Sequence, residues 1–148
     1  MNTDLYAWAA ARCARQECSR RDISTKLVGK GATAAEAREV VDRLVSEGFI
    51  DDARYARAFV ADKFRFERWG RVKISYMLHL KGLPDDVVDE ALHQIDDTQY
   101  VETLKDLLEA KLRTLRAATP FALRQKVART AISRGFEPDL VFQVMNLL

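Results

Sequence analysis

The sequence has few residues of the kinds that bind metals. Its 148 residues include two cysteines and two histidines. A structural zinc site needs four such ligands in one place, but Cys13 and Cys18 lie far along the chain from His79 and His93. We therefore expect no metal site, and two reduced thiols of the kind found in cytoplasmic proteins.

Long apolar runs and the motifs of common enzymes are also lacking. No stretch approaches the roughly 18 consecutive apolar residues of a membrane span. The first residues do not pair a basic segment with an apolar one, as a signal peptide does. No glycine-rich phosphate loop, nucleophile elbow or zinc-binding histidine pair is present. We expect a soluble, cytoplasmic, monomeric protein without cofactors, membrane contacts or catalytic activity.

Glycine and proline are scarce as well, with six and three residues. Between them the apolar residues have helical spacing. From Val101 to Leu115 an apolar side chain recurs every three or four positions, which is typical of an amphipathic helix. No segment shows the clean alternation of a half-buried strand. The sequence therefore predicts an all-α fold.

Three glycines mark an internal repeat. Gly31, Gly82 and Gly135 are 51 and 53 positions apart, and each follows a basic residue. We expect each to end a helix in the left-handed conformation, because that conformation costs glycine little. Alignment on these glycines superposes six apolar positions per copy: Ile23, Leu27, Ala37, Val40, Val41 and Leu44; Ile74, Leu78, Val88, Ala91, Leu92 and Ile95; Val127, Ala131, Val141, Val144, Met145 and Leu148.

The repeat predicts three tandem three-helix units at 1–48, 49–97 and 98–148, arranged as an elongated, curved array. Each unit shows the same order of helices, with a short second helix that ends at the aligned glycine. The first helices of the units are expected near 4–17, 52–67 and 98–116.

Several polar residues are placed to begin helices. Thr33 with Glu36 fits a capping box, and Pro84 suits a first helical turn. The adjacent Asp51 and Asp52 could bind a metal in principle. Their position at the start of a helix favours N-capping instead.

The net charge of +2 does not by itself predict a nucleic-acid partner, but the charges are clustered. Of the 24 Lys and Arg residues, 21 lie in 12–30, 54–81 and 111–134, whereas acids concentrate in 36–52 and 85–109. A basic stripe attracts phosphates and steers anionic partners. Solvated helix faces with local ion pairs are the alternative. Recurrence in all three units favours a functional surface.

The densest basic segment also carries aromatic residues. Four aromatic and four basic residues are interleaved there: Phe59, Lys63, Phe64, Arg65, Phe66, Arg68, Trp69 and Arg71. Aromatic rings among Arg and Lys can stack on bases or on guanidinium groups. Core packing is the alternative, which we favour for Phe59 and Phe64 and leave open for Phe66 and Trp69.

One continuous motif runs from Gly48 to Gly82. It begins with Gly-Phe-Ile-Asp-Asp-Ala-Arg-Tyr-Ala at 48–56 and continues with Trp-Gly-Arg-Val-Lys-Ile at 69–74. This motif resembles the signature of the RecX family of recombinase regulators, and a weaker likeness extends over nearly the whole chain. The family commonly has proline and arginine at the positions of Arg71 and Lys73. Lysine lacks the bidentate geometry of arginine, so position 73 keeps a charge but not that geometry.

The resemblance implies a non-enzymatic protein of three three-helix repeats that acts in DNA repair, DNA recombination and the SOS response. It implies binding to the RecA recombinase, particularly to its nucleoprotein filament. It also implies modulation, usually inhibition, of strand exchange and ATPase activity. Two other functions stay open. One is a DNA-binding module of helix-turn-helix character that acts without a recombinase. The other is a helical scaffold for an acidic protein.

Two sets of candidate residues follow from the motif and the charge pattern. The basic residues expected to contact RecA, or single- or double-stranded DNA, are Arg54, Arg57, Lys63, Arg65, Arg68, Arg71, Lys73, Arg124, Lys126 and Arg129. The residues expected to set the backbone geometry of the motif are Gly48, Phe49, Asp51, Asp52, Tyr55, Gly70 and Gly82.

Overall fold

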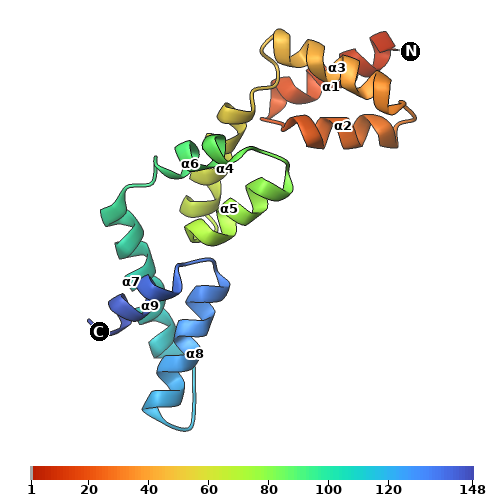
Figure 1. Cartoon of the computed structure of the whole chain (residues 1–148). Coiled ribbons are helices and arrows are strands. Elements are labelled where there is room, and N and C mark those ends of the chain that lie inside the picture. Colours follow the sequence, from red (N-terminus) through yellow and green to blue (C-terminus); the bar gives the residue numbers. More distant parts are fainter. Residues whose placement is uncertain (1) are drawn as a thin grey trace. The chain divides into compact units, whose positions relative to one another are not determined.

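The computed structural model describes residues 2–148, with their side chains from Asp4 onward. Within this range the regular secondary structure is helical throughout (Figure 1), which confirms the all-α prediction. None of the described helices has both the length and the apolar character of a membrane span. The helices are α1 Asn2–Arg15, α2 Arg20–Gly29, α3 Ala34–Ser46, α4 Asp52–Arg65, α5 Arg71–Leu80, α6 Asp85–Leu92, α7 Asp97–Thr114, α8 Pro120–Ser133 and α9 Pro138–Met145.

The first helix of each expected unit ends slightly early. α1, α4 and α7 end at Arg15, Arg65 and Thr114, two residues before the predicted limits. After α1 and α7 the chain becomes extended, and the residue before the next helix acts as its N-cap. Ser19 accepts a hydrogen bond from a backbone N–H of α2 (3.1 Å), and Thr119 does the same for α8 (3.0 Å). Capping the next helix therefore limits the length of the preceding one.

Gly31, Gly82 and Gly135 end α2, α5 and α8 with the same hydrogen bonds. Their φ angles are 102°, 82° and 100°. The N–H of each glycine donates to the carbonyl three residues earlier (3.0, 2.9 and 2.9 Å), and the next N–H donates to the carbonyl five residues earlier (3.1, 3.3 and 3.2 Å). This is the Schellman pattern, in which the left-handed residue is most often glycine. The repeated glycines are confirmed as helix ends.

The predicted helix starts are confirmed with one exception. Thr33 and Glu36 form the reciprocal capping box of α3 (3.1 and 2.9 Å), and these bonds lower the pKa of Glu36. Asp51 accepts a hydrogen bond from the backbone N–H three residues later (3.1 Å), as an N-cap does. Pro84 is the exception, because α6 begins one residue later at Asp85 and the carbonyl of Pro84 accepts its first hydrogen bond (3.1 Å). Pro84 therefore precedes the first turn.

The aligned apolar positions form the cores of the repeats. Of the eighteen side chains, all are buried except Leu92, which is half-buried, and Leu148, which is 37 % exposed. Burial of this many aligned positions means that the three copies use equivalent residues for packing. The spacing of apolar residues around a repeated glycine thus identifies part of each core, but not Tyr100 and Phe136, the two largest fully buried side chains.

Contacts between residues divide the chain into two compact units. The first comprises the chain up to Phe59 together with Leu78–Ala91, and the second comprises Val60–Met77 together with Leu92–Leu148. In the first unit α1, α2 and α3 pack against one another, and in the second α7, α8 and α9 do the same (Figure 1). The helices of the middle repeat are divided between these units. The repeat boundaries at 49 and 97, and the curvature of the array, remain predictions.

Candidate partner-binding surface

In the first compact unit, the side chain of Arg54 forms hydrogen bonds within the protein. Its Nε donates to a carboxylate oxygen of Glu17 (2.6 Å), and its Nη2 donates to the carbonyls of Gly48 (3.1 Å) and Phe49 (3.3 Å). The hydrogen bond to Glu17 raises the pKa of Arg54. Arg54 thus links α4 to the chain that follows α1. A partner contact at Arg54 would compete with these bonds.

Tyr55 of α4 lies in the same unit, where the chain after α5 contacts the start of α2; we call this contact the first joint. The ammonium of Lys81 lies 5.9 Å from the centre of the Tyr55 ring and forms an ion pair with Asp22 (3.1 Å). Burial raises the pKa of the Tyr55 hydroxyl. Next to this pair, a Cβ on Gly82 would lie 2.8 Å from the guanidinium of Arg21, a flexible group that can move aside, so it is the φ of 82° that favours glycine there. The motif residues Tyr55 and Gly82 therefore face the N-terminal end of α2.

An equivalent contact, which we call the second joint, lies in the second unit, where Tyr100 of α7 contacts the start of α5 and the residue before α9. The Tyr100 hydroxyl donates to the carboxylate of Glu137 and accepts a hydrogen bond from the backbone N–H of Arg71 (2.9 Å). The guanidinium of Arg71 lies 3.8 Å from the ring centre and forms ion pairs with Asp97 (2.6 Å) and Glu137 (3.4 Å). Burial and the hydrogen bond to Glu137 raise the pKa of Tyr100. Arg71, a predicted partner contact, is thus engaged inside this unit.

At the second joint, the backbone at the start of α5 also contacts the backbone at the end of α8. The N–H of Gly70 donates to the carbonyl of Arg134, and the N–H of Val72 donates to the carbonyl of Gly135 (both 2.9 Å). A Cβ on Gly70 would lie 2.3 Å from the carbonyl group of Gly135, and a Cβ on Gly135 would lie 2.3 Å from the Cβ of Lys73. Both glycines are therefore required by close backbone approach.

The two joints share a sequence pattern. Asp-Asp-x-x-Tyr occurs at 51–55 and again at 96–100. The first aspartate of each copy is an N-cap, and the second accepts a hydrogen bond from the first residue of α2 or α5 (3.2 and 2.6 Å). The first copy lies within the predicted motif, whereas Asp97, Tyr100 and Glu137 were not predicted as site residues. The recurrence of the pattern could have identified the first two, whereas Glu137 has no such signal.

The turn after α4 presents basic and aromatic side chains at the surface. We name residues 65–68 the basic turn. Phe66 is 72 % exposed, and Arg65 and Arg68 are exposed on either side of it. Arg68 has a φ of 55°, a left-handed conformation that is uncommon for a residue with a side chain. Neither arginine forms a side-chain hydrogen bond or an ion pair with any residue that the structure describes.

The other aromatic residues of this segment pack inward. Phe59 and Phe64 each pack against a tyrosine ring, with ring centres 5.9 and 5.8 Å apart. Trp69 is half-buried, and the ammonium groups of Lys63 and Lys73 lie 5.1 and 4.3 Å from its ring centre. Of the four aromatic residues, Phe66 is the one that is exposed. It is therefore the aromatic side chain of this segment best placed to contact a partner.

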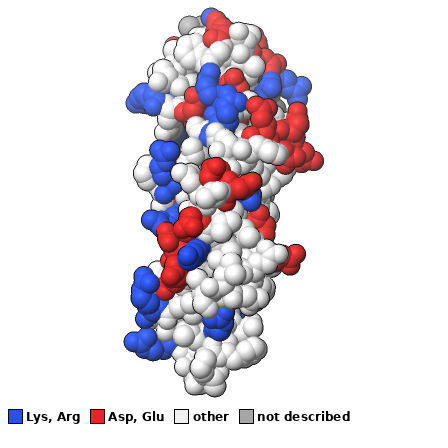
Figure 2. Space-filling view, turned by 90° about the vertical axis from the view of Figure 1, so that its left-hand side faces the viewer, with Lys and Arg blue, Asp and Glu red and all other residues white. Residues whose placement is uncertain are grey.

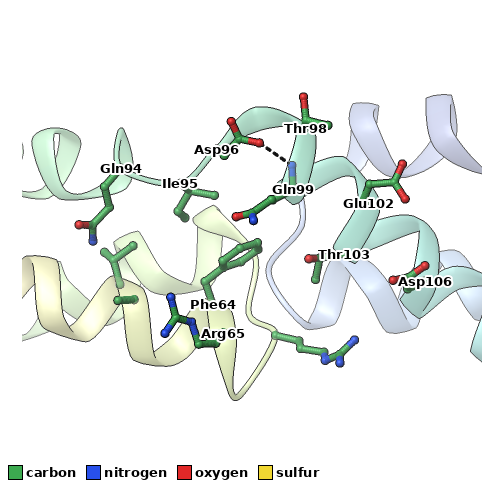
Figure 3. Close-up of a pocket in the computed structure, with 13 residues that line it drawn as sticks. Phe64, Arg65, Gln94, Ile95, Asp96, Thr98, Gln99, Glu102, Thr103 and Asp106 are labelled. Atoms are coloured by element: carbon green, nitrogen blue, oxygen red, sulfur yellow. Dashed lines mark hydrogen bonds between the residues drawn. The ribbon is translucent and has the colours of Figure 1, made fainter.

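Beside the basic turn lies a cleft of about 530 Å³, formed by the end of α4, the chain before α7 and the first turns of α7. Figure 3 shows Phe64 of α4 pointing toward α7, with Glu102 and Asp106 on α7. The dashed line in Figure 3 is the hydrogen bond that caps α7, from the N–H of Gln99 to Asp96 (2.9 Å). The lining combines apolar, basic and acidic side chains, chiefly Phe64, Ile95, Arg65, Arg68, Glu102 and Asp106.

The remaining predicted basic residues lie earlier on α4 and on α8. Arg57 forms an ion pair with Glu90 of α6 (3.8 Å). On α8, Arg124 and Lys126 donate to backbone carbonyls (2.5 and 3.1 Å), and Arg129 is exposed. The structure therefore brings the predicted residues between 63 and 73 together, whereas α8 contributes no side chain to the cleft.

Charges of both signs are exposed on the protein. On the face drawn in Figure 2, Lys and Arg side chains lie close to Asp and Glu side chains. Exposed pairs of this kind compensate charge locally and contribute little free energy. The two arginines of the basic turn differ because they have no such ion pair. Among residues 2–148, no group of three or more His, Cys, Asp or Glu side chains is placed to hold a metal ion.

Comparisons with known proteins identify the family. Two family models match this chain, the second three-helix domain of RecX at 51–92 and the third three-helix domain at 97–145. The regulatory protein RecX of Leptothrix cholodnii is 34% identical, over 90% of this chain and 82% of that protein. The regulatory protein RecX of Chlorobaculum tepidum is 32% identical, over 87% and 78%. That of Clostridium botulinum is 31% identical, and this chain covers 59% of its length.

The fold agrees with these matches. The crystal structure of RecX from Lactobacillus salivarius superposes with a TM-score of 0.85, over 99% of this chain and 97% of that chain. The two sequences are 21% identical, so this similarity shows a shared fold. The shared helical fold, the two matching domains and the relatives that are more than 30% identical lead to one conclusion: the chain belongs to the RecX family of regulatory proteins.

Proposed function

We propose that this chain is a non-enzymatic regulator that binds the RecA recombinase and its nucleoprotein filament, and that it lowers recombinase and ATPase activity. The observation that carries the proposal is the basic turn, which lies within the family motif. Its two arginines are exposed without ion pairs on either side of the exposed Phe66. Aromatic and arginine side chains are enriched at protein interfaces and often dominate their binding energy.

The proposed mechanism is occupancy of the filament. A protein bound along the filament can block a second DNA strand or alter the addition of RecA subunits, and it needs no catalytic group for either effect. Exposed arginines would steer the chain toward acidic surfaces and raise its association rate. In this proposal the chain acts in the cytoplasm as a monomer.

The test is the single-stranded-DNA-dependent ATPase activity of RecA, titrated with this chain at fixed salt. We expect the wild-type chain to lower the rate at less than one molecule per RecA subunit. Reversing both charges with Arg65→Glu and Arg68→Glu should raise the concentration for half-maximal effect about tenfold, since each exposed charge contributes up to about 1 kcal/mol. The matched control reverses Lys26 and Arg38, which are exposed on α2 and α3. An equal loss in this control would show that net charge, not the basic turn, controls binding.

A DNA-only arm separates the second candidate function. Arginines beside an exposed aromatic ring are also a surface that binds single-stranded nucleic acid. Binding to a labelled oligothymidylate is measured across a range of salt concentrations, because phosphate contacts give a steep salt dependence. Tight, salt-sensitive binding with no change in the RecA ATPase would favour the DNA-binding module. No effect in either arm would leave the helical scaffold.

A further inference from the structure

The cleft beside the basic turn carries unpaired charges of both signs. Arg65 and Arg68 line it from the end of α4 and the basic turn, and Glu102 and Asp106 line it from α7. All four side chains are exposed. No ion pair joins the arginines to the carboxylates among the residues that the structure describes. Between them, Phe64 supplies apolar surface. The charges are thus available to an occupant of the cleft.

The acidic side of the cleft disfavours a nucleic-acid strand. A cavity of this volume is about 8 Å across, which equals the distance over which charges are screened at physiological salt, about 8 Å. Phosphates that reached Arg65 and Arg68 would therefore still be repelled by the carboxylates of Glu102, Asp106 and Asp96. A polyanion is attracted by the arginines on one side of the cleft and repelled by the carboxylates on the other.

We propose that the cleft binds a short protein segment in which an acidic, an apolar and a basic side chain follow one another. The acidic side chain pairs with Arg65 or Arg68, the apolar one packs on Phe64, and the basic one pairs with Glu102 or Asp106. The first and third residues of an extended segment lie about 7 Å apart, which fits a cleft about 8 Å across. The inference rests on the proposed function, because the segment belongs to the RecA subunit that the chain binds.

Charge reversal on the two sides of the cleft tests this inference by the sign of its effect. The variants are Arg65→Glu and Glu102→Lys, with Arg38→Glu and Glu39→Lys on the exposed side of α3 as matched controls. Affinity for RecA filaments on single-stranded DNA is measured for each variant. We expect both cleft variants to bind about fivefold more weakly than their controls. A DNA occupant predicts the opposite for Glu102→Lys, because this change removes a repulsion. Unchanged or tighter filament binding by Glu102→Lys would overturn the inference.

A second measurement does not depend on the filament. The tripeptide acetyl-Glu-Leu-Lys-amide is titrated at millimolar concentration into the isotope-labelled full chain, and amide resonances are followed by NMR. We expect shifts at Gln99 and Thr103, which line the cleft, and smaller shifts in Glu102→Lys. Peptide shifts without filament binding would refute the proposed function and leave the cleft assignment standing. Filament binding without peptide shifts, and without an effect of Glu102→Lys, would refute the cleft assignment alone.

Discussion

Replacement of Gly70 by alanine tests the second joint. A Cβ at this position would lie 2.3–2.4 Å from backbone atoms of Gly135 and Phe136. The backbone cannot give way as a flexible side chain would, so the start of α5 has to move. Movement strains or breaks the two backbone hydrogen bonds to Arg134 and Gly135 (both 2.9 Å). Overpacking typically costs about 1–3 kcal/mol, and each lost hydrogen bond costs about 1 kcal/mol.

The expected destabilisation is therefore about 3–5 kcal/mol, a large share of the 5–15 kcal/mol by which domains are usually stable. For a chain of this length it corresponds to a fall in Tm of about 6–20 °C. Because the chain has two compact units, the unfolding signal should come from the second one. Trp8 lies in the first unit and Trp69 in the second. A Trp8→Phe background makes tryptophan fluorescence report on the second unit.

The matched control is Gly29→Ala. Gly29 is the last residue of α2, and nothing lies within 4 Å of a Cβ built there. Alanine at a helical position with free space is favoured over glycine by about 0.5–1 kcal/mol. Because Gly29 lies in the first unit, we expect this variant to leave the unfolding of the second unit, reported by Trp69, unchanged. If Gly70→Ala unfolded at the same urea concentration as Gly29→Ala, the close backbone approach at the second joint would be refuted.

Two further predictions concern titratable groups. Burial and Glu137 raise the pKa of Tyr100 above its usual value near 10, so its contribution to stability is complete below pH 10 and is lost as pH rises through the raised pKa. The Tyr100→Phe variant should be less stable by about 1–3 kcal/mol at pH 7, because it leaves the N–H of Arg71 without its acceptor. It should also show a shallower loss of stability above pH 10 in urea titrations, and an unchanged slope would contradict this assignment. Burial, and then the neighbouring Cys18, raise the pKa of Cys13 to about 12. Alkylation of Cys13 by iodoacetamide at pH 8, followed by mass spectrometry, should be at least about a hundredfold slower than in the urea-unfolded chain.

The elements of the fold could be predicted because their signals are local. A glycine ends a helix through hydrogen bonds that reach back at most five positions, and the capping box of Thr33 and Glu36 spans four residues. The apolar positions around each glycine follow from helical periodicity alone. Each of these features depends on short stretches of sequence. The three aligned copies then reinforced one another.

The roles of individual arginines could not be predicted in the same way. Arg71 pairs with Asp97 and Glu137, which lie 26 and 66 positions away in sequence. An arginine that pairs inside the protein and one that faces solvent look the same in a charge pattern. The steric need for Gly70 depends equally on the distant Gly135. These contacts depend on how the helices pack, which periodicity does not specify.

The difference between an arginine that pairs inside the protein and one that faces solvent decides which substitutions can test regulation by the chain. Arg71→Glu would place a third carboxylate beside Asp97 and Glu137, where Arg71 now neutralises both. Loss of filament binding by such a variant would report on disruption of the second joint as much as on a lost contact. Arg65 is exposed and forms no ion pair among the described residues, so reversing its charge leaves the joint intact. Thermal unfolding of the two variants should separate the cases: Arg71→Glu lowers Tm strongly, whereas Arg65→Glu weakens binding and lowers Tm only slightly, because a carboxylate in the last turn of α4 opposes the helix dipole. A fall in Tm for Arg65→Glu as large as that for Arg71→Glu would show that the basic turn belongs to the packing of the second unit and not to a surface for a partner.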